Sequence, residues 1–464
     1  MAKTETVRRA AEERELAKRR KQQAHRKPKG YLVYLLVVLS IVYIVDEVTS
    51  AIGTAMQSEV VTEFFVLGRN MEYNQGLAAF TAMSAPLYSM MILMPFYKSL
   101  ADRFGRKLFL VVNTVGMGVG MGICMNARGP LVYLFGMLVI NFVMYNDMQV
   151  MYVMECAPEK HRAKLTSLTK AVALLGVTAI PVLRDVFMGN DGTQWRKVFM
   201  IPAVVAVVVG VAAIFLMDET PVFVARRIAH LEMTEEQRMA KAAAERTAAE
   251  EKGGVFRALK FIFSHKQSRA VALCAMVFMF STGVTGYYES IMKTGGMSTA
   301  EVTQAMYYIP FCNALMTAIG GFITDGLGRK KSAIALSTVA FVGLTVFVLA
   351  SNLGLSPAMV GISYGFFIGG LWSVSDMLCL IMAGESSPTY IRASVLGSMS
   401  LLVGMGTVGS NLAIMVGMLF VESIGILSLC VCGPFMLIAL ILLFTQVKET
   451  KGVDLNTVTG TEWD

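Results

Sequence analysis

Ionisable side chains inside long apolar runs are the residues of this sequence whose types suggest chemistry. Burying such a group in hydrocarbon costs about 3 kcal/mol or more, so each is a functional candidate by default. A carboxylate in a poorly hydrated cavity can bind and release a proton near neutral pH, as a proton carrier must. Five carboxylates stand against one lysine, which favours a cationic ligand or several proton sites. The six residues are Asp46, Glu47, Asp147, Lys170, Glu289 and Asp376.

Two of these residues lie at matched depths. Asp147 is eight residues before Glu155, and Lys170 is eight residues after Arg162. At 1.5 Å per residue, both therefore lie about 12 Å inside their runs, and an ion pair between them is plausible. Lys170 either recognises an anion or only neutralises Asp147. Asp376 is the near-repeat counterpart of Asp147 in the second half of the chain.

Aromatic and amide side chains near the same depth complete the predicted binding site. Aromatic rings suit stacking or cation–π contact with a flat organic solute, although helix packing and interface anchoring are commoner reasons for aromatics in spans. We expect substrate contacts from Tyr145, Asn146, Tyr287, Tyr288 and Trp372, beside the charged Asp147, Lys170, Glu289 and Asp376. The sequence has no Cys/His cluster, phosphate loop or Ser-His-Asp set. It therefore predicts no metal, no cofactor and no enzyme activity.

Twelve apolar runs must position these residues. The chain has 464 residues, of which 55% are hydrophobic and only 16% charged, which is too little charged surface for a soluble fold of this length. A run of about 20 apolar residues crosses a membrane as a helix. The runs lie near 31–52, 75–97, 108–127, 130–154, 165–187, 197–217, 268–292, 301–323, 332–350, 357–383, 394–420 and 422–446.

This spacing predicts an all-α polytopic membrane protein built from two bundles. Six helices at 31–217 and six at 268–446 are joined by a polar linker at 218–267, which we expect to hold short surface helices. A basic tail at 1–30 precedes the bundles, and a second tail follows at 447–464. No cleavable signal peptide is visible, because the first 30 residues are charged.

Lys and Arg gather on one side of the predicted membrane. Eleven of the 41 lie in residues 1–30, and most others fall in loops on that same side. The positive-inside rule then predicts a plasma-membrane protein with both termini in the cytoplasm. The basic tail would lie against anionic inner-leaflet lipids, and nothing supports a nucleic-acid partner. The opposite side has Arg69, Arg128, Arg184, Arg196, Lys197 and Lys293.

The two halves carry duplicated loop motifs. Residues 100–107 read Leu-Ala-Asp-Arg-Phe-Gly-Arg-Lys, and 323–330 read Ile-Thr-Asp-Gly-Leu-Gly-Arg-Lys. A Glu-x-x-Pro-x-x-x-Arg motif begins at Glu155 and again at Glu385, 230 residues later. The glycines permit tight turns, and the charged residues can pair as the halves move, or they only fix topology and helix ends. The predicted gating residues are Asp102, Arg103, Gly105, Arg106, Glu155, Arg162, Asp325, Gly328, Arg329, Glu385 and Arg392.

On these motifs the sequence resembles the major facilitator superfamily over about residues 31–450. The resemblance implies two six-helix bundles around a midplane cavity that works by alternating access. The duplicated Glu-x-x-Pro-x-x-x-Arg motifs, 218–221 (Asp-Glu-Thr-Pro) and 448–452 (Lys-Glu-Thr-Lys-Gly) are similar to the sugar-porter and organic-ion branches. Asp46, with Glu47 beside it, falls where related proton-coupled families place a proton-exchanging carboxylate.

The sugar-binding pattern of that branch matches poorly. Lys170 stands where sugar porters carry a Gln, and 280–288 keeps a Tyr pair but lacks the Gln pair and Asn. We therefore expect a monomeric secondary transporter for a small organic ion, coupled to protons through Asp46 and Glu47. The alternatives are a sugar:proton symporter, proton-driven drug efflux and a receptor with a transporter fold.

Overall fold

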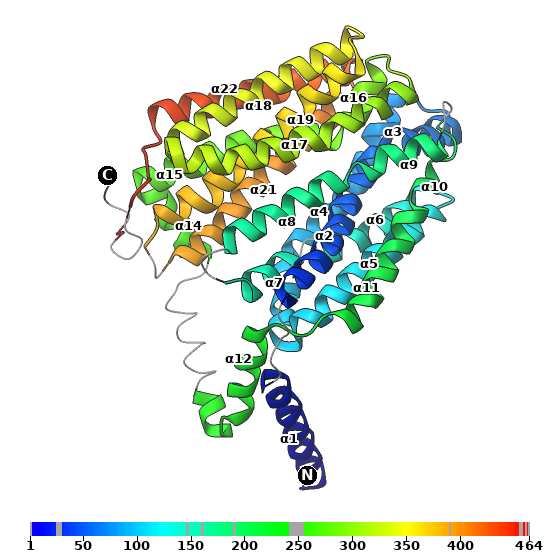
Figure 1. Ribbon diagram of the computed structural model, residues 1–464. Coiled ribbons are helices and arrows are strands. Elements are labelled where there is room, and N and C mark those ends of the chain that lie inside the picture. Colours follow the sequence, from blue (N-terminus) through cyan, green and yellow to red (C-terminus); the bar gives the residue numbers. More distant parts are fainter. Residues whose placement is uncertain are drawn as a thin grey trace.

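The computed structural model describes residues 2–24, 30–144, 148–158, 162–188, 192–240, 255–388, 391–453, 458–459 and 462. Regular structure in these residues is helical, and Figure 1 traces it along the chain. The first half contains α1 (Ala2–Ala24), α2 (Tyr31–Ala55), α3 (Gln57–Val61), η1 (Thr62–Leu67), α4 (Tyr73–Phe104), α5 (Arg106–Met125), α6 (Pro130–Met144), α7 (Met148–Cys156), α8 (Arg162–Gly176), α9 (Ala179–Phe187), α10 (Trp195–Val198) and α11 (Met200–Leu216).

The linker and the second half follow the same pattern. The linker contributes α12 (Pro221–Glu232) and α14 (Val255–Ser264), the surface helices expected there. The second half contains α15 (Lys266–Phe278), η3 (Met279–Gly286), α16 (Tyr288–Thr294), α17 (Thr299–Leu327), α18 (Arg329–Asn352), α19 (Pro357–Asp376), η4 (Met377–Met382), α20 (Ala383–Glu385), α21 (Arg392–Gly417) and α22 (Ile424–Thr445).

Ten segments of the described chain are long and apolar enough to cross a membrane. The other two expected spans are α4, with 32 residues, and the fifth span, which is divided into α8 and α9. The division has a local cause at Pro181, which lacks the N–H that would bond to the Val177 carbonyl and whose ring crowds that carbonyl. The fifth span is therefore two short helices in series.

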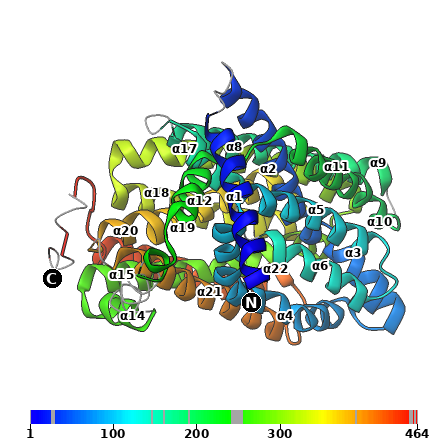
Figure 2. The same cartoon turned by 90° about the horizontal axis from the view of Figure 1, so that it is seen from below.

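The two halves form bundles that lie side by side (Figure 2). α8 packs on α17, and α4 packs on α21, so both halves contribute to the interface. Large apolar side chains cover the outside of each bundle, and Phe215, Phe322 and Phe420 are each more than four-fifths exposed. Such an apolar exterior matches a hydrocarbon solvent rather than water.

The two ends of the bundles differ in sequence and in contacts. We call the end with the turns at Gly105 and Gly328 the termini face, because α1 and the residues after α22 leave the bundles there (Figure 1). The opposite end, with the loops at Gly192 and Gly296, is the distal face.

The N-terminal tail forms a helix that is paired with the linker. On α1, Glu15 accepts hydrogen bonds from Arg227 of α12, with a closest N–O distance of 2.9 Å. Arg20 bonds to Glu232 at 2.7 Å, again joining α1 to α12. The hydrogen bond from Arg227 lowers the pKa of Glu15. The acidic residues of the tail thus hold it to the linker, while Arg14, Lys18 and Lys21 remain exposed.

Candidate functional site

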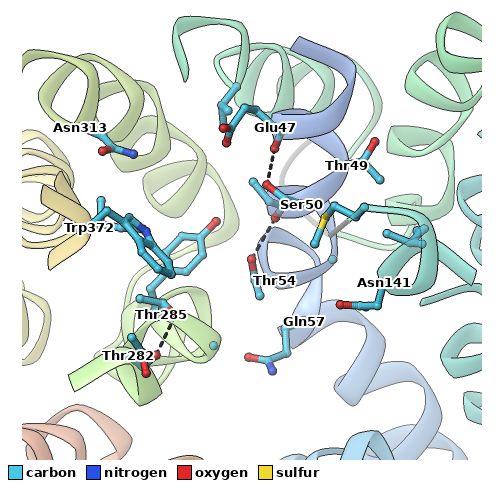
Figure 3. Close-up of a pocket in the computed structure, with 18 of the residues that line it drawn as sticks. Glu47, Thr49, Ser50, Thr54, Gln57, Asn141, Thr282, Thr285, Asn313 and Trp372 are labelled. Carbon is cyan, nitrogen blue, oxygen red and sulfur yellow. Dashed lines mark hydrogen bonds between the residues drawn. The ribbon is translucent and has the colours of Figure 1, made fainter. Parts of the chain in front are cut away.

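A cavity of about 660 Å³ lies between the two bundles. Its wall comes from α2, α4, α6 and α8 of the first half and from η3, α16, α17, α19 and α21 of the second. Figure 3 shows Glu47, Thr54 and Asn141 on one side of this space and Asn313 and Trp372 on the other. The cavity is therefore lined by both repeats, as the duplication implied.

Asp46 lies on the cavity wall with a neutral partner. The residue is 7% exposed, and Gln149 of α7 donates from its Nε2 to Asp46 Oδ2 at 3.0 Å. Gln149 was missed in the sequence, where a lone glutamine in the fourth run carried no signal of its own. Glu47 also lines the cavity, and its backbone carbonyl accepts a hydrogen bond from Ser50 (Figure 3).

Lys170 pairs with a residue of the other bundle. Its Nζ lies 3.7 Å from Asp376 Oδ2, and both side chains line the cavity. The expected partner, Asp147, lies outside the described residues together with Tyr145 and Asn146. The ion pair shown by the structure joins the fifth span to the tenth span, across the two halves.

Amide and hydroxyl side chains supply most of the polar wall. Gln57, Asn141, Asn313 and Asn411 bring four amides, and hydroxyls such as those of Thr49, Ser50, Thr54, Thr81, Thr282, Thr285 and Thr407 surround them. Gln57 and Asn313 were not expected in the site from the sequence. A polar residue within an apolar run was the only available signal, and that signal is shared by residues that bond to their own helix.

The predicted aromatic contacts divide into wall and core. Trp372 is 43% exposed and faces the cavity (Figure 3). Tyr287 is almost fully buried, and its hydroxyl contacts Thr81 Oγ1 at 3.3 Å across the bundles. Tyr288 stacks on Tyr364 with ring centroids 4.8 Å apart. Trp372 is thus the most accessible of the three.

Glu289 was expected at the substrate, but it lies in a separate charge cluster toward the distal face. It is completely buried, and Ser58 donates to it from its backbone N–H at 2.7 Å and from its hydroxyl. Arg184 Nη2 lies 3.8 Å from Glu289 and 3.2 Å from Glu59. Lys293 completes the group, 3.8 Å from Glu59. We call Glu59, Arg184, Glu289 and Lys293 the distal charge cluster.

Arg184 was counted from the sequence among the basic residues of the side opposite the termini. It lies near the end of α9, and its side chain is completely buried, which the sequence did not indicate. Its guanidinium donates to the Ala55 carbonyl and, at 3.1 Å, to Thr303 of the other bundle. A basic residue close to the end of an apolar run cannot be distinguished by sequence from a loop residue.

The duplicated motifs form two matching clusters at the termini face. Glu219 accepts hydrogen bonds from the backbone N–H groups of Arg106 and Lys107 at the start of α5. Glu449 accepts the equivalent bonds from Arg329 and Lys330 at the start of α18. Each carboxylate therefore satisfies the free N–H groups of a helix start, where the helix dipole favours negative charge. The preceding glycines, Gly105 and Gly328, have φ values of 114° and 95°.

The gating carboxylates have other partners than those we expected. Glu155 bonds to Arg106 at 3.2 Å and Glu385 bonds to Arg329 at 3.1 Å, so each joins the two motifs of its own half. Arg392 donates to the Ser387 carbonyl. The partners that the structure describes for Glu155 and Glu385 are thus the turn arginines, and the expected pair of Glu155 with Arg162 falls on a side chain outside the described part. The side chains of Asp102, Arg103, Arg162 and Asp325 lie outside the described part of the chain.

The fold and the cavity define a secondary transporter, and comparison with known families agrees. The family model of the Major Facilitator Superfamily matches residues 35–408, and the chain belongs to this superfamily. It is similar to D-xylose-proton symporter-like 2 of Arabidopsis thaliana, with 23% identity over 397 residues that cover 78% of this chain and 77% of that protein. It is also similar to the glucose transporter GlcP of Staphylococcus epidermidis, with 22% identity over 324 residues, covering 66% of this chain and 72% of that protein.

Among solved structures, the chain resembles the xylose transporter XylE from E. coli in a partially occluded inward open conformation. The TM-score is 0.65 at 16% identity, covering 92% of this chain and all of that one. This likeness shows the fold. The protein is therefore a multi-pass membrane transporter of the Major Facilitator Superfamily, working by alternating access, and the family and its relatives are transporters rather than enzymes.

Proposed function

We propose that the protein is a proton-coupled symporter for a small organic ion, and that this ion is a cation. The observation that carries the proposal is the charge of the cavity wall. Among the described residues that line it, Asp46, Glu47 and Asp376 are acidic and Lys170 is basic, and Lys170 forms an ion pair with Asp376. The acids thus outnumber the base in this part of the wall, and Trp372 offers a ring face for a cation.

Asp46 has the surroundings that a proton carrier needs. Its partner Gln149 is neutral and has both donor and acceptor atoms, so it can bond to the ionised or the protonated carboxyl group. Glu47, which we assign to proton coupling with Asp46, is its neighbour on α2 and also lines the cavity, so both carboxylates lie beside the space for the substrate.

The same proposal includes the orientation and the boundaries of the bundles. The termini face, with its basic loops, would be cytoplasmic in the plasma membrane, and the exposed cations of α1 would lie near anionic lipids. The bundles would extend over 31–217 and 268–446 in a monomer. Hydrogen bonds between the bundles cluster toward the distal face, including Tyr73 to Ser290 at 2.8 Å, so the cavity would face the cytoplasm.

Uptake into proteoliposomes under an imposed pH gradient tests the proposal. A panel of organic cations, organic anions and sugars is offered, and the wild type is compared with Asp46→Asn. We expect gradient-driven uptake of a cation that the Asp46→Asn variant loses, although the variant still exchanges substrate without a gradient. Gradient-driven uptake that survives Asp46→Asn would contradict the assigned proton role. Extrusion of a broad set of apolar cations would favour drug efflux, and ligand binding without flux would favour a receptor.

A sugar:proton symporter is the second candidate, and the four amides of the cavity wall favour it. Sugars bind through many amide and hydroxyl partners, and Gln57, Asn141, Asn313 and Asn411 surround the space in which Trp372 could stack. The named relatives are described as transporters of xylose and glucose. Uptake of a neutral sugar that is reduced by Asn313→Leu, with no cation flux, would support this candidate.

A further inference from the structure

The distal charge cluster is a thin barrier between two cavities. Gln57 of α3 lines the central cavity. The next two residues, Ser58 and Glu59, line a second cavity of about 620 Å³ on the distal side, together with Lys293. Neighbouring residues of one short helix thus face different spaces. Along α3, the chain therefore passes from the wall of the central cavity to the wall of the distal one next to the cluster.

The cluster contains two acids and two bases, with one of each on either bundle. Glu59 and Arg184 belong to the first bundle, and Glu289 and Lys293 belong to the second. The bonds between the bundles are Arg184 to Glu289 and Lys293 to Glu59, both at 3.8 Å, and the pair within the first bundle is shorter at 3.2 Å. If the bundles separate here, each therefore retains a complete acid–base pair.

The second bundle can form its own pair without refolding. Glu289 and Lys293 are four residues apart on α16, in the order in which Glu and Lys side chains attract each other along a helix. Leaving a buried charge without a partner is strongly unfavourable, and this arrangement avoids that penalty in both the closed and the open states.

We propose that the distal charge cluster is the outer lock of the transport cycle and that it opens by exchange of partners. Glu59 keeps Arg184, while Glu289 gives up Ser58 and Arg184 and takes Lys293. Arg184 is the positioning residue, because its guanidinium contacts Ala55, Glu59, Thr303 and Glu289 and so joins four helices, α2, α3, α17 and α16, in the closed state. The proposal rests on alternating access and is independent of the substrate.

A cysteine at Thr54, on the central cavity wall, reports whether the lock is open. An impermeant maleimide is applied to intact cells, with Glu72→Cys on the exposed distal loop as the orientation control and the parent chain as background. We expect Arg184→Gln to raise the labelling rate of Thr54→Cys by about tenfold or more, because the change removes a buried positive charge that contacts residues of both bundles. Arg196→Gln is the matched control, because Arg196 bonds to Glu63 of its own bundle on the same face. Equal labelling in the two arginine variants would overturn the proposal.

Transport by two further variants separates a lock from a merely structural cluster. Glu289→Gln leaves Lys293 without its acid in the open state, so we expect transport to fall by about tenfold. Adding Lys293→Gln removes the charge that has lost its partner. We expect the double variant to transport about threefold faster or more than Glu289→Gln, which is within the usual coupling of contacting residues. A double variant no faster than Glu289→Gln would overturn partner exchange.

Discussion

Lys170 on α8 and Asp376 at the end of α19 form an ion pair of 3.7 Å that joins the two bundles on the wall of the central cavity. Their side chains are 35% and 54% exposed. A pair this exposed contributes at most about 1 kcal/mol to stability. Its location therefore makes it more important for the charge of the cavity than for the free energy of unfolding.

Opposite shifts in substrate KM are expected when each partner is neutralised. Lys170→Gln leaves one more net negative charge, so the KM for a cation should fall by about fivefold, the effect of about 1 kcal/mol. Asp376→Asn leaves Lys170 unopposed and should raise it by a similar factor. Initial uptake rates at several substrate concentrations measure both values. Reversed signs would indicate an anion, and two unchanged KM values would indicate a neutral sugar.

The caps at Glu219 and Glu449 should respond to pH in opposite directions. Burial raises the pKa of Glu219 despite its bonds from backbone N–H groups. Burial opposes the same kind of bonds at Glu449, where the bonds from Lys451, Arg329, Lys330 and Thr450 prevail and the pKa is lowered. A carboxyl group whose pKa is raised by folding stabilises the fold at pH values below its usual pKa, and this stabilisation is lost as the pH rises. A carboxyl group whose pKa is lowered by folding stabilises the fold at pH values above its usual pKa.

Glutamine variants at these two positions test the sign by thermal unfolding. As pH falls from about 7 to 4.5, the Tm difference between wild type and Glu219→Gln should grow. The difference between wild type and Glu449→Gln should be the larger of the two at pH 7, and it should shrink only as the pH falls below about 4.5 toward the lowered pKa. Parallel behaviour of the two variants would mean that the caps are electrostatically equivalent.

The N-terminal helix should leave the linker under acidic conditions. Because the hydrogen bond from Arg227 lowers the pKa of Glu15 below its usual 4.5, the contact is formed above that value and lost as pH falls through the lowered one. Glu15→Gln should expose α1 to protease at neutral pH. Glu13→Gln, at an exposed position on the same helix, is the control and should be cut at the wild-type rate.

Gly361 should be intolerant of any side chain. A Cβ at this position would lie 2.0 Å from the Ala305 carbonyl oxygen, so α19 would have to move away from α17. Overpacking of this kind costs about 1–3 kcal/mol. Gly361→Ala should lower the Tm in detergent, and Gly397→Ala, where a Cβ meets nothing within 4 Å, should not. An unchanged Tm in Gly361→Ala would mean that the two helices can separate freely.

The architecture was predictable because its signals are local and repeated. Apolar runs gave the spans, and the motif pair at Gly105 and Gly328 gave the duplication. The pairing of charges was not predictable in the same way. The burial of Arg184 had no signal in the sequence, and neither did the contact of Lys170 with Asp376. Such contacts depend on how the two bundles pack against each other, and the spacing of residues along one helix does not indicate that packing.

The break at Pro181 has a mechanical consequence for the fifth span. Lys170 lies on α8 and Arg184 lies on α9. The two residues of the fifth span that contact the second bundle are therefore on separate helices. A continuous helix would have to surrender backbone hydrogen bonds each time it bent. Here the proline has already removed that bond in every conformation, so the span can flex at this joint with little added resistance. The contacts of Lys170 and Arg184 with the second bundle can then form and break at different times.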